Sequence, residues 1–280
     1  MTSRLSIKSI ALLESIRPFT SILGLAGAYI GAMVAGAPII SLPVILAMIV
    51  VFLVGAGSMP FNDYFDYEID KISHPNRPIP SKRLKPNDAL YFSIILFALA
   101  LVISLFINFL CFFIVVFSIS FLYLYEVYMK NQGFIGNVFV AFLSSLSFTF
   151  GGAAVGNPFA SILLSIITFF LFTGRETLKD VQDVKGDLLS RSTLPMQIGE
   201  KNAAIVGSIF LIIAIFLTPF PYILGHLRIG YLIFISIVDL ICIYAIFETL
   251  KDLKNTERTV SLLRTASAIG IIAIIIGAVL

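Results

Sequence analysis

The chain alternates between long apolar runs and short segments that carry almost all of its charges. A helix needs about 20 apolar residues to cross the hydrocarbon core of a bilayer. Such runs predict nine membrane-spanning helices, at residues 16–36, 41–62, 88–108, 111–129, 134–155, 159–179, 202–222, 229–248 and 263–280. The runs are continuously apolar, which disfavours the short alternating strands of a membrane β-barrel. The predicted fold class is therefore all-α, a polytopic membrane protein.

The composition excludes a soluble domain. Of the 280 residues, 59% are hydrophobic and 12% are charged, whereas soluble domains carry about 25% charged residues. The two cysteines, Cys111 and Cys242, both lie inside apolar runs and exclude a disulfide scaffold. A net charge of +3, scattered along the chain, does not predict a nucleic-acid surface. Nothing in the sequence indicates an obligate protein partner, so the expected surroundings are membrane lipid.

The basic residues predict how the chain is oriented. With nine spans, 18 of the 19 Lys and Arg fall on the side of the N-terminus, and Arg228 is the exception. Cytoplasmic loops are enriched in Lys and Arg. We therefore expect a multi-pass protein of the cell membrane with its N-terminus in the cytoplasm and its C-terminus outside. Residues 1–15 begin with basic residues but lack a cleavage site, which favours an interfacial helix over a signal peptide.

Two charged loops on the cytoplasmic side, 63–87 and 175–201, repeat one pattern of aspartates. Asp63, Asp66 and Asp70 recur 117 residues later as Asp180, Asp183 and Asp187. The spacing i, i+3, i+7 places each set on one helix face, where like charges repel and a compensating cation is expected. A basic segment with a proline follows each set. We expect a single membrane-embedded domain, 1–280, with a pseudo-repeat formed by motif one (62–84) and motif two (175–195).

Two acidic helix faces at one membrane surface predict a metal-bound diphosphate. Hard oxygen ligands select Mg²⁺ or Ca²⁺, and Mg²⁺ is typically bound by few carboxylates together with substrate phosphates. Two other interpretations remain open at this point. In the first, the aspartates pair only with neighbouring Lys and Arg in solvated loops. In the second, Asp63 and Asp180 support the metal ligands and do not bind the metal themselves.

The motifs resemble a known family. Asn62-x3-Asp66-x3-Asp70 followed by NRPIPSKRL resembles the first signature of the UbiA superfamily of intramembrane prenyltransferases, and GRETLKDVQDVKGD (174–187) resembles its second. Arg17-Pro18 and Tyr125-x4-Lys130 also match positions common in that family. The resemblance covers essentially the whole chain and implies nine helices around a central cavity with a cytoplasmic cap. Two positions depart from the pattern: Glu126 replaces a frequent Ser or Thr, and Lys82 replaces a frequent Gly.

Within the superfamily, the motifs most resemble the archaeal digeranylgeranylglyceryl phosphate synthases. The resemblance implies Mg²⁺-dependent transfer of a geranylgeranyl group from geranylgeranyl diphosphate to the hydroxyl of geranylgeranylglyceryl phosphate, a step of archaeal ether-lipid synthesis. Two Mg²⁺ ions are implied. The implied metal ligands are Asn62, Asp66, Asp70, Asp180, Asp183 and Asp187, and the implied catalytic set is Asn62, Asp66, Asp70, Asp183, Asp187 and Lys130. The implied substrate-binding residues are Arg17, Arg77, Lys82, Arg83, Tyr125, Arg175 and Lys179.

Several alternatives stay open. Lys130 suits either a diphosphate contact or an anchor whose ammonium reaches the headgroups. The basic cluster of Lys82, Arg83 and Lys85 suits either an acceptor phosphate or anionic lipid. An aromatic prenyl acceptor, as in quinone, tocopherol or chlorophyll pathways, fits the same motifs. A cation transporter would place its carboxylates near the midplane, where only Asp239 lies. A CDP-alcohol phosphotransferase would carry a D-G-x2-A-R signature, which is missing.

Overall fold

All regular secondary structure in the described part of the chain is helical. The structure is a computed structural model, and it describes residues 2–187 and 192–279, with the side chains of 2–6, 19, 20, 23, 185–187 and 279 excepted. The helices are α1 Thr2–Ser15, α2 Pro18–Val34, α3 Leu42–Phe65, α4 Tyr67–Ser73, α5 Pro86–Leu105, α6 Phe109–Leu124, the π-turn η1 Tyr125–Met129, α7 Phe134–Ala154, α8 Pro158–Asp187, α9 Leu194–Ile198, α10 Glu200–Leu217, α11 Phe220–Ile223, α12 Ile229–Lys251, the 3₁₀ turn η2 Leu253–Asn255 and α13 Thr256–Val279.

These helices confirm the predicted all-α membrane fold. Among the described residues, eight helices are long and apolar enough to cross a bilayer. The remaining predicted span corresponds to α2, whose apolar part, Gly24–Val34, is shorter. Helix α8 is 30 residues long and continues past its apolar part to Asp187. It therefore carries the aspartates of motif two out of the apolar region without a break in the helix.

Two apolar cores hold the bundle together. The first core joins α3, α5, α6 and α7 through residues such as Val50, Cys111 and Phe150. The second core joins α8, α10, α12 and α13 through residues such as Leu211 and Leu263. Helix α2 packs against α3, α7 and α13, so it connects the two halves. A third, small cluster packs α1 onto the segment between α4 and α5.

Glycines let α2 and α7 approach each other closely. A Cβ added to Gly31 would lie 1.9 Å from the carbonyl oxygen of Phe148, and a Cβ added to Gly151 would lie 1.9 Å from that of Ala28. Small residues at helix interfaces in membranes commonly permit such backbone contact. These two glycines therefore serve helix packing and do not widen a cavity.

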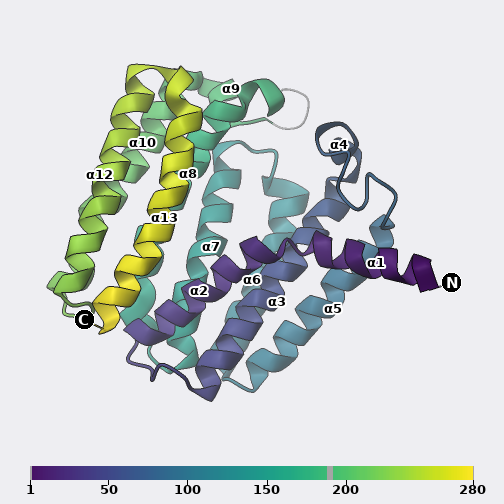
Figure 1. Cartoon of the computed structure of the whole chain (residues 1–280), viewed down its shortest axis with the longest axis horizontal. Coiled ribbons are helices and arrows are strands. Elements are labelled where there is room, and N and C mark those ends of the chain that lie inside the picture. The colour runs from purple at the N-terminus through teal and green to yellow at the C-terminus, as the bar shows by residue number, and fades with distance from the viewer. Residues whose placement is uncertain (1, 188–191, 280) are drawn as a thin grey trace.

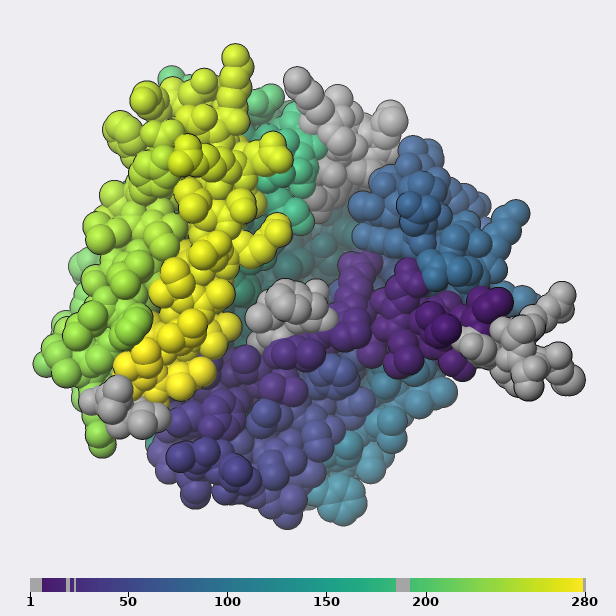
Figure 2. Space-filling view, in the orientation of Figure 1, coloured from purple at the N-terminus to yellow at the C-terminus, as the bar shows by residue number. Residues whose placement is uncertain are grey.

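The two motif-bearing loops lie at one end of the bundle. Figure 1 shows α4, α9 and the turn between α12 and α13 at the same end, with the C-terminus at the other. Figure 2 shows the surface drawn inward between α13 on one side and α1 and α4 on the other. This hollow agrees with the expected cavity that opens toward the charged loops.

Candidate active site

Motif one lies at a junction between two helices. Pro60 stands inside α3 and cannot donate a backbone hydrogen bond, and α3 ends five residues later at Phe65. Asp66 separates α3 from α4, but the helical hydrogen bonds continue across the junction. The Asp66 N–H donates to the Asn62 carbonyl at 2.9 Å, and the Asp70 N–H donates to the Asp66 carbonyl at 2.8 Å. The motif therefore follows one nearly continuous helical path.

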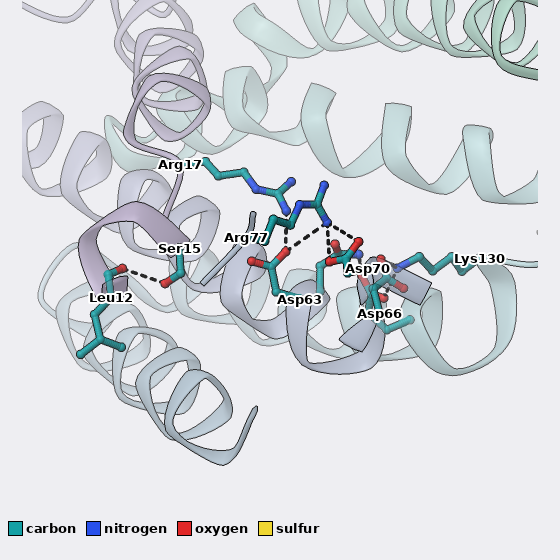
Figure 3. A network of polar contacts seen from close by, with 10 residues as sticks. Leu12, Ser15, Arg17, Asp63, Asp66, Asp70, Arg77 and Lys130 are labelled. Atoms are coloured by element: carbon teal, nitrogen blue, oxygen red, sulfur yellow. Dashed lines mark hydrogen bonds and ion pairs between the residues drawn. The ribbon is translucent and has the colours of Figure 1, made fainter. Parts of the chain in front are cut away.

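Two arginines neutralise the outer aspartates of motif one. Arg17 Nη2 lies 2.5 Å from Asp63 Oδ1. Arg77 Nη1 lies 2.5 Å from Asp70 Oδ2 and 3.5 Å from Asp63 Oδ1, as Figure 3 shows. Asp63 and Asp70 are each 2% exposed, so these carboxylates depend on the arginines for charge compensation. The arginines come from the α1–α2 break and from the segment after α4.

The middle aspartate of motif one contacts a different cation. Asp66 Oδ2 accepts a hydrogen bond from Lys130 Nζ at 2.6 Å. Residues seven apart on a helix differ by about 20° in direction, whereas residues three apart differ by about 60°. Asp63 and Asp70 therefore share Arg77, and Asp66 points to Lys130 (Figure 3). The shared helix face expected from the spacing is thus divided: Asp63 and Asp70 face two arginines, and Asp66 faces Lys130.

A π-turn positions Lys130. The N–H of Lys130 donates to the carbonyl of Tyr125 at 2.9 Å, five residues back. Single π-turns at the ends of α-helices are frequent at functional sites. Glu126 lies in this turn; its Oε2 accepts from Lys130 Nζ at 2.8 Å and its Oε1 accepts from Asn62 Nδ2 at 2.8 Å. The turn therefore brings residues of the fourth apolar run onto motif one.

Motif two is arranged differently on α8. Asp180 is 3% exposed and accepts a hydrogen bond at 2.7 Å from Nδ2 of Asn137 on α7. Two basic residues expected to bind substrate lie beside Glu176: Arg175 Nη2 at 2.5 Å and Lys179 Nζ at 3.9 Å. Asp183 is half-buried on the same helix. The side chain of Asp187 and the whole of Arg191 lie outside the described residues.

One short segment of chain contacts both motifs. Glu126 and Lys130 bind motif one, and Asn137, seven residues after Lys130, binds Asp180 of motif two. The turn between them also meets the loop that follows motif two, since a Cβ on Gly133 would lie 2.7 Å from Nε2 of Gln197. Among the described residues, no three His, Cys, Asp or Glu side chains are grouped as a metal site. The aspartates of motif one are instead held by Arg17, Arg77 and Lys130.

Lys82 and Arg83 occupy the segment between α4 and α5. Arg83 is bound to Glu14 of α1, with Nη2 at 2.9 Å from Oε1, and its Nη2 also donates to the Asn76 carbonyl at 2.7 Å. The hydrogen bond from Arg83 lowers the pKa of Glu14 below its usual value. Arg83 therefore ties α1 to this segment. Lys82 is exposed and has a φ of +61°, which explains why a glycine is frequent at this position.

Two residues that make contacts in the site, Glu126 and Asn137, were not predicted from the sequence. Glu126 was noted only as a departure from a family pattern, and Asn137 was not singled out. A signal for Asn137 exists, because it is a lone amide in the apolar run FIGNVFVAF and polar side chains in such runs commonly hydrogen-bond to another helix. No comparable signal identifies its partner Asp180, which lies 43 residues away.

Comparison with known proteins identifies the family. Residues 24–276 match the UbiA prenyltransferase family. A digeranylgeranylglyceryl phosphate synthase of Methanococcus maripaludis (strain C7) is 39% identical over 236 residues, which cover 82% of this chain and 84% of that protein. A solved structure of a digeranylgeranylglyceryl phosphate synthase in membranes has a TM-score of 0.85 and 36% identity, and the match covers 97% of this chain and 99% of that one.

A more distant structure shares the fold. A UbiA homologue from Archaeoglobus fulgidus bound to GPP and Mg²⁺ has a TM-score of 0.71 at 18% identity, covering 95% of this chain and 98% of that one. The match to the family spans most of the chain and agrees with the helices and the paired motifs described above. The chain belongs to the UbiA prenyltransferase family.

Proposed function

We propose that this enzyme transfers a geranylgeranyl group from geranylgeranyl diphosphate to the hydroxyl of geranylgeranylglyceryl phosphate and releases diphosphate. The relatives that carry this activity in their names are 36% and 39% identical over most of the chain. The observation that carries the proposal is the segment from Glu126 to Asn137, which contacts both aspartate motifs. This contact brings together two stretches of chain that are far apart in the sequence.

The oxygen donors of the two motifs fit divalent cations. Asn62, Asp66 and Asp70 follow one helical path and supply an amide oxygen and two carboxylates, which are ligands that Mg²⁺ prefers. A UbiA homologue with the same fold is bound to GPP and Mg²⁺. In the proposal one Mg²⁺ is held by this set and a second by Asp183 and Asp187, with Asp180 supporting them. Bound Mg²⁺ neutralises the charge that develops on the leaving diphosphate.

The basic residues of the site would receive the diphosphate oxygens. Arg17, Arg77 and Lys130 each contact a carboxylate of motif one, so they lie beside the proposed metal. Cations aimed at a leaving group stabilise the transition state in which its charge develops. Arg175 and Lys179 would act from motif two, and Tyr125 from the π-turn. This charge stabilisation requires no general base of unusual pKa before the allylic cation forms.

The proposal also covers the binding of the acceptor and the orientation of the protein in the membrane. Lys82 is exposed near motif one and is available to an acceptor phosphate, whereas Arg83 is occupied by Glu14. The apolar helices would exclude water from the allylic cation until the acceptor hydroxyl attacks. The excess of Lys and Arg on the motif side supports a cytoplasmic active site and N-terminus and an outside C-terminus in this proposal.

Purified protein offered both substrates tests the proposal. With Mg²⁺ and geranylgeranyl diphosphate, we expect transfer to geranylgeranylglyceryl phosphate and none to an aromatic acid offered beside it. Asp66→Ala and Asp183→Ala should each lower the rate by at least about 100-fold if these carboxylates carry the metals. Asp252→Ala, in the α12–α13 turn, is the control. Exclusive use of the aromatic acid would exclude the proposed acceptor, and full activity of both Asp variants would exclude the metal assignment.

A further inference from the structure

Glu126 adds a negative charge to a region that is already acidic. Its side chain is 4% exposed and lies within the turn that faces motif one. Burying an ionised carboxylate costs several kcal/mol unless hydrogen bonds or a partner charge compensate. A buried residue that served only to pack the turn would be apolar. The compensation must therefore come from the contacts of Glu126.

Both carboxylate oxygens of Glu126 accept hydrogen bonds from residues of the proposed active site. Oε1 accepts from Asn62 Nδ2 at 2.8 Å, and Oε2 accepts from Lys130 Nζ at 2.8 Å. Lys130 also binds Asp66 Oδ2 at 2.6 Å. Glu126 thus joins an expected metal ligand to an expected diphosphate contact.

The first contact determines which end of the Asn62 amide is available. A side-chain amide has a donor end, Nδ2, and an acceptor end, Oδ1, and only the oxygen binds a cation. An ionised carboxylate only accepts hydrogen bonds, so Glu126 holds Nδ2 and leaves Oδ1 free to face a metal. A partner that both donates and accepts, such as an amide, would permit Asn62 to flip and present Nδ2 instead.

The second contact keeps Lys130 in place when its other partner changes. Asp66 cannot give the same oxygen lone pair to a metal and to the ammonium of Lys130. If Asp66 binds Mg²⁺, Glu126 remains as the anchor of Lys130 Nζ, whose free N–H groups can then reach a diphosphate oxygen. The π-turn supports this arrangement because it fixes Glu126 and Lys130 on the same side of the chain.

We propose that Glu126 is a positioning residue that orients the Asn62 amide oxygen toward the metal and holds Lys130 for the diphosphate. The inference rests on the proposed function for the identity of these ligands. It assigns a specific task to a position at which the family commonly has Ser or Thr, which offers a single side-chain oxygen and so cannot hold both donors in the same way.

The substitution Glu126→Gln preserves shape and tests the assignment. The new amide has one acceptor oxygen for two donors, so one of Asn62 and Lys130 loses its partner. Losing such a supporting contact typically lowers metal affinity by about 10–100-fold. We expect the Mg²⁺ concentration for half-maximal activity to rise within that range. Binding without turnover, read as the thermal stabilisation of purified protein by Mg²⁺ with inorganic pyrophosphate, should shift to higher Mg²⁺ in parallel.

An exchange of the two side chains provides the decisive variant. In Asn62→Asp combined with Glu126→Gln, the new amide donates to the new carboxylate and accepts from Lys130, so every partner is satisfied and the net charge is unchanged. We expect the double variant to recover at least a large part of the Mg²⁺ affinity lost in Glu126→Gln. Because the double variant also restores the net charge, the effect of charge alone is read from a separate control. Glu68→Gln, at an exposed carboxylate of α4, is the charge-matched control and should leave Mg²⁺ affinity unchanged.

The outcomes separate this inference from the proposed function. If the wild type fails to transfer the prenyl group, the proposed function is wrong, and Mg²⁺-dependent stabilisation by pyrophosphate still reports on Glu126. If the wild type is active and Glu126→Gln keeps its Mg²⁺ dependence, the inference is wrong. If Glu126→Gln fails to fold, the double variant decides: restored folding with near wild-type Mg²⁺ affinity supports the inference, and an unfolded or weakly binding double variant contradicts it.

Discussion

The two aspartate motifs share a spacing but differ in how their charge is compensated. In motif one, Asp63, Asp66 and Asp70 contact Arg17, Lys130 and Arg77, which come from three separate segments of the chain. In motif two, Asp180 accepts a hydrogen bond from a neutral amide, and Arg175 contacts Glu176 on its own helix. The first motif is thus held by ion pairs between distant segments, and the second by one long helix and its neighbour α7.

This difference follows from how each motif is built into the fold. Helix α8 continues through motif two, so its backbone keeps the aspartates in one helical register. Motif one spans the break between α3 and α4 and is followed by an irregular segment. Ion pairs from Arg17 in the α1–α2 break, from Lys130 after η1 and from Arg77 in that segment hold the junction. We therefore expect the loss of Arg17 at motif one to cost more stability than the loss of the Asn137 amide at motif two.

The largest expected effect on stability comes from Arg17→Ala. Among the described residues, it leaves Asp63, which is 2% exposed, with Arg77 at 3.5 Å as its one cation. Removing one partner of a buried ion pair costs about 3–5 kcal/mol, and we expect about 3 kcal/mol here because Arg77 remains. The loss in free energy of unfolding is measured by denaturant unfolding of purified protein in detergent. The thermal unfolding midpoint of the same sample should fall with it.

Arg83→Ala is the matched control. It removes an arginine from the pair with Glu14, in which both side chains are more than a third exposed. Exposed pairs contribute about 0–1 kcal/mol, so this variant should unfold close to the wild type. Equal losses in the two variants would contradict the distinction between the buried cluster of motif one and the pairs on the surface.

The second expected effect tests motif two. Asn137→Leu removes the amide that donates to Asp180 Oδ2, whose side chain is 3% exposed. The loss of one donor to a buried acceptor lowers stability by about 1–3 kcal/mol. The free energy of unfolding should fall by this amount, less than in Arg17→Ala. Asn202→Leu, which removes an exposed side-chain contact to a backbone carbonyl, should change it little; a larger loss in Asn137→Leu than in Arg17→Ala would reverse the ranking of the motifs.

The sequence predicted the spans and the motifs because these depend on local pattern. The apolar run 41–62 became α3, Leu42–Phe65, and the run 134–155 became α7, Phe134–Ala154. The aspartate spacing located motif one but not its basic partners, whose positions depend on how separate segments of the chain pack. The contacts Asn62–Glu126 and Asn137–Asp180 join residues 64 and 43 positions apart. They follow from lateral helix packing, which the periodicity of a single helix does not encode.

The segments after the two motifs differ in the residue that adopts a positive φ, and the expected effect on stability is smaller. Lys82 in the first loop and Gly199 in the second both have positive φ, +61° and +87°. A side chain in this conformation costs about 1 kcal/mol relative to glycine. Lys82→Gly should therefore raise the free energy of unfolding by about 1 kcal/mol, and Gly199→Ala should lower it by about 1 kcal/mol. No atom lies within 4 Å of a Cβ added at Gly199, so steric contact does not explain the second change.

Thermal unfolding of both variants in the same detergent measures the two changes in stability. Opposite signs are expected, because glycine adopts a positive φ more readily than a residue with a side chain. Two variants that shift in the same direction would show that the side chain of Lys82, and not its backbone, dominates at that position. Activity distinguishes a further role, because a loss of acceptor binding in Lys82→Gly would support contact with the acceptor phosphate.

The smallest expected effect concerns Asp239, a carboxylate far from both motifs on α12. The hydroxyl of Thr218 has one proton, yet it lies 2.7 Å from the Ile215 carbonyl and 2.9 Å from Asp239 Oδ2. If the hydroxyl donates to the carbonyl, Asp239 must donate to the hydroxyl and is therefore protonated. Its Oδ1 is buried without a hydrogen-bond partner among the described residues, which an ionised carboxylate would tolerate poorly.

Asp239→Asn replaces this neutral donor with another of the same shape. We expect the free energy of unfolding to change by less than about 0.5 kcal/mol, whereas Asp239→Leu, which leaves the Thr218 hydroxyl without its donor, should cost about 1–2 kcal/mol. Infrared spectra of the purified protein near neutral pH should show a protonated-carboxyl carbonyl band that Asp239→Asn removes. A loss of more than 1 kcal/mol in Asp239→Asn, without such a band in the wild type, would show that Asp239 is ionised and, like the aspartates of motif one, needs a cation.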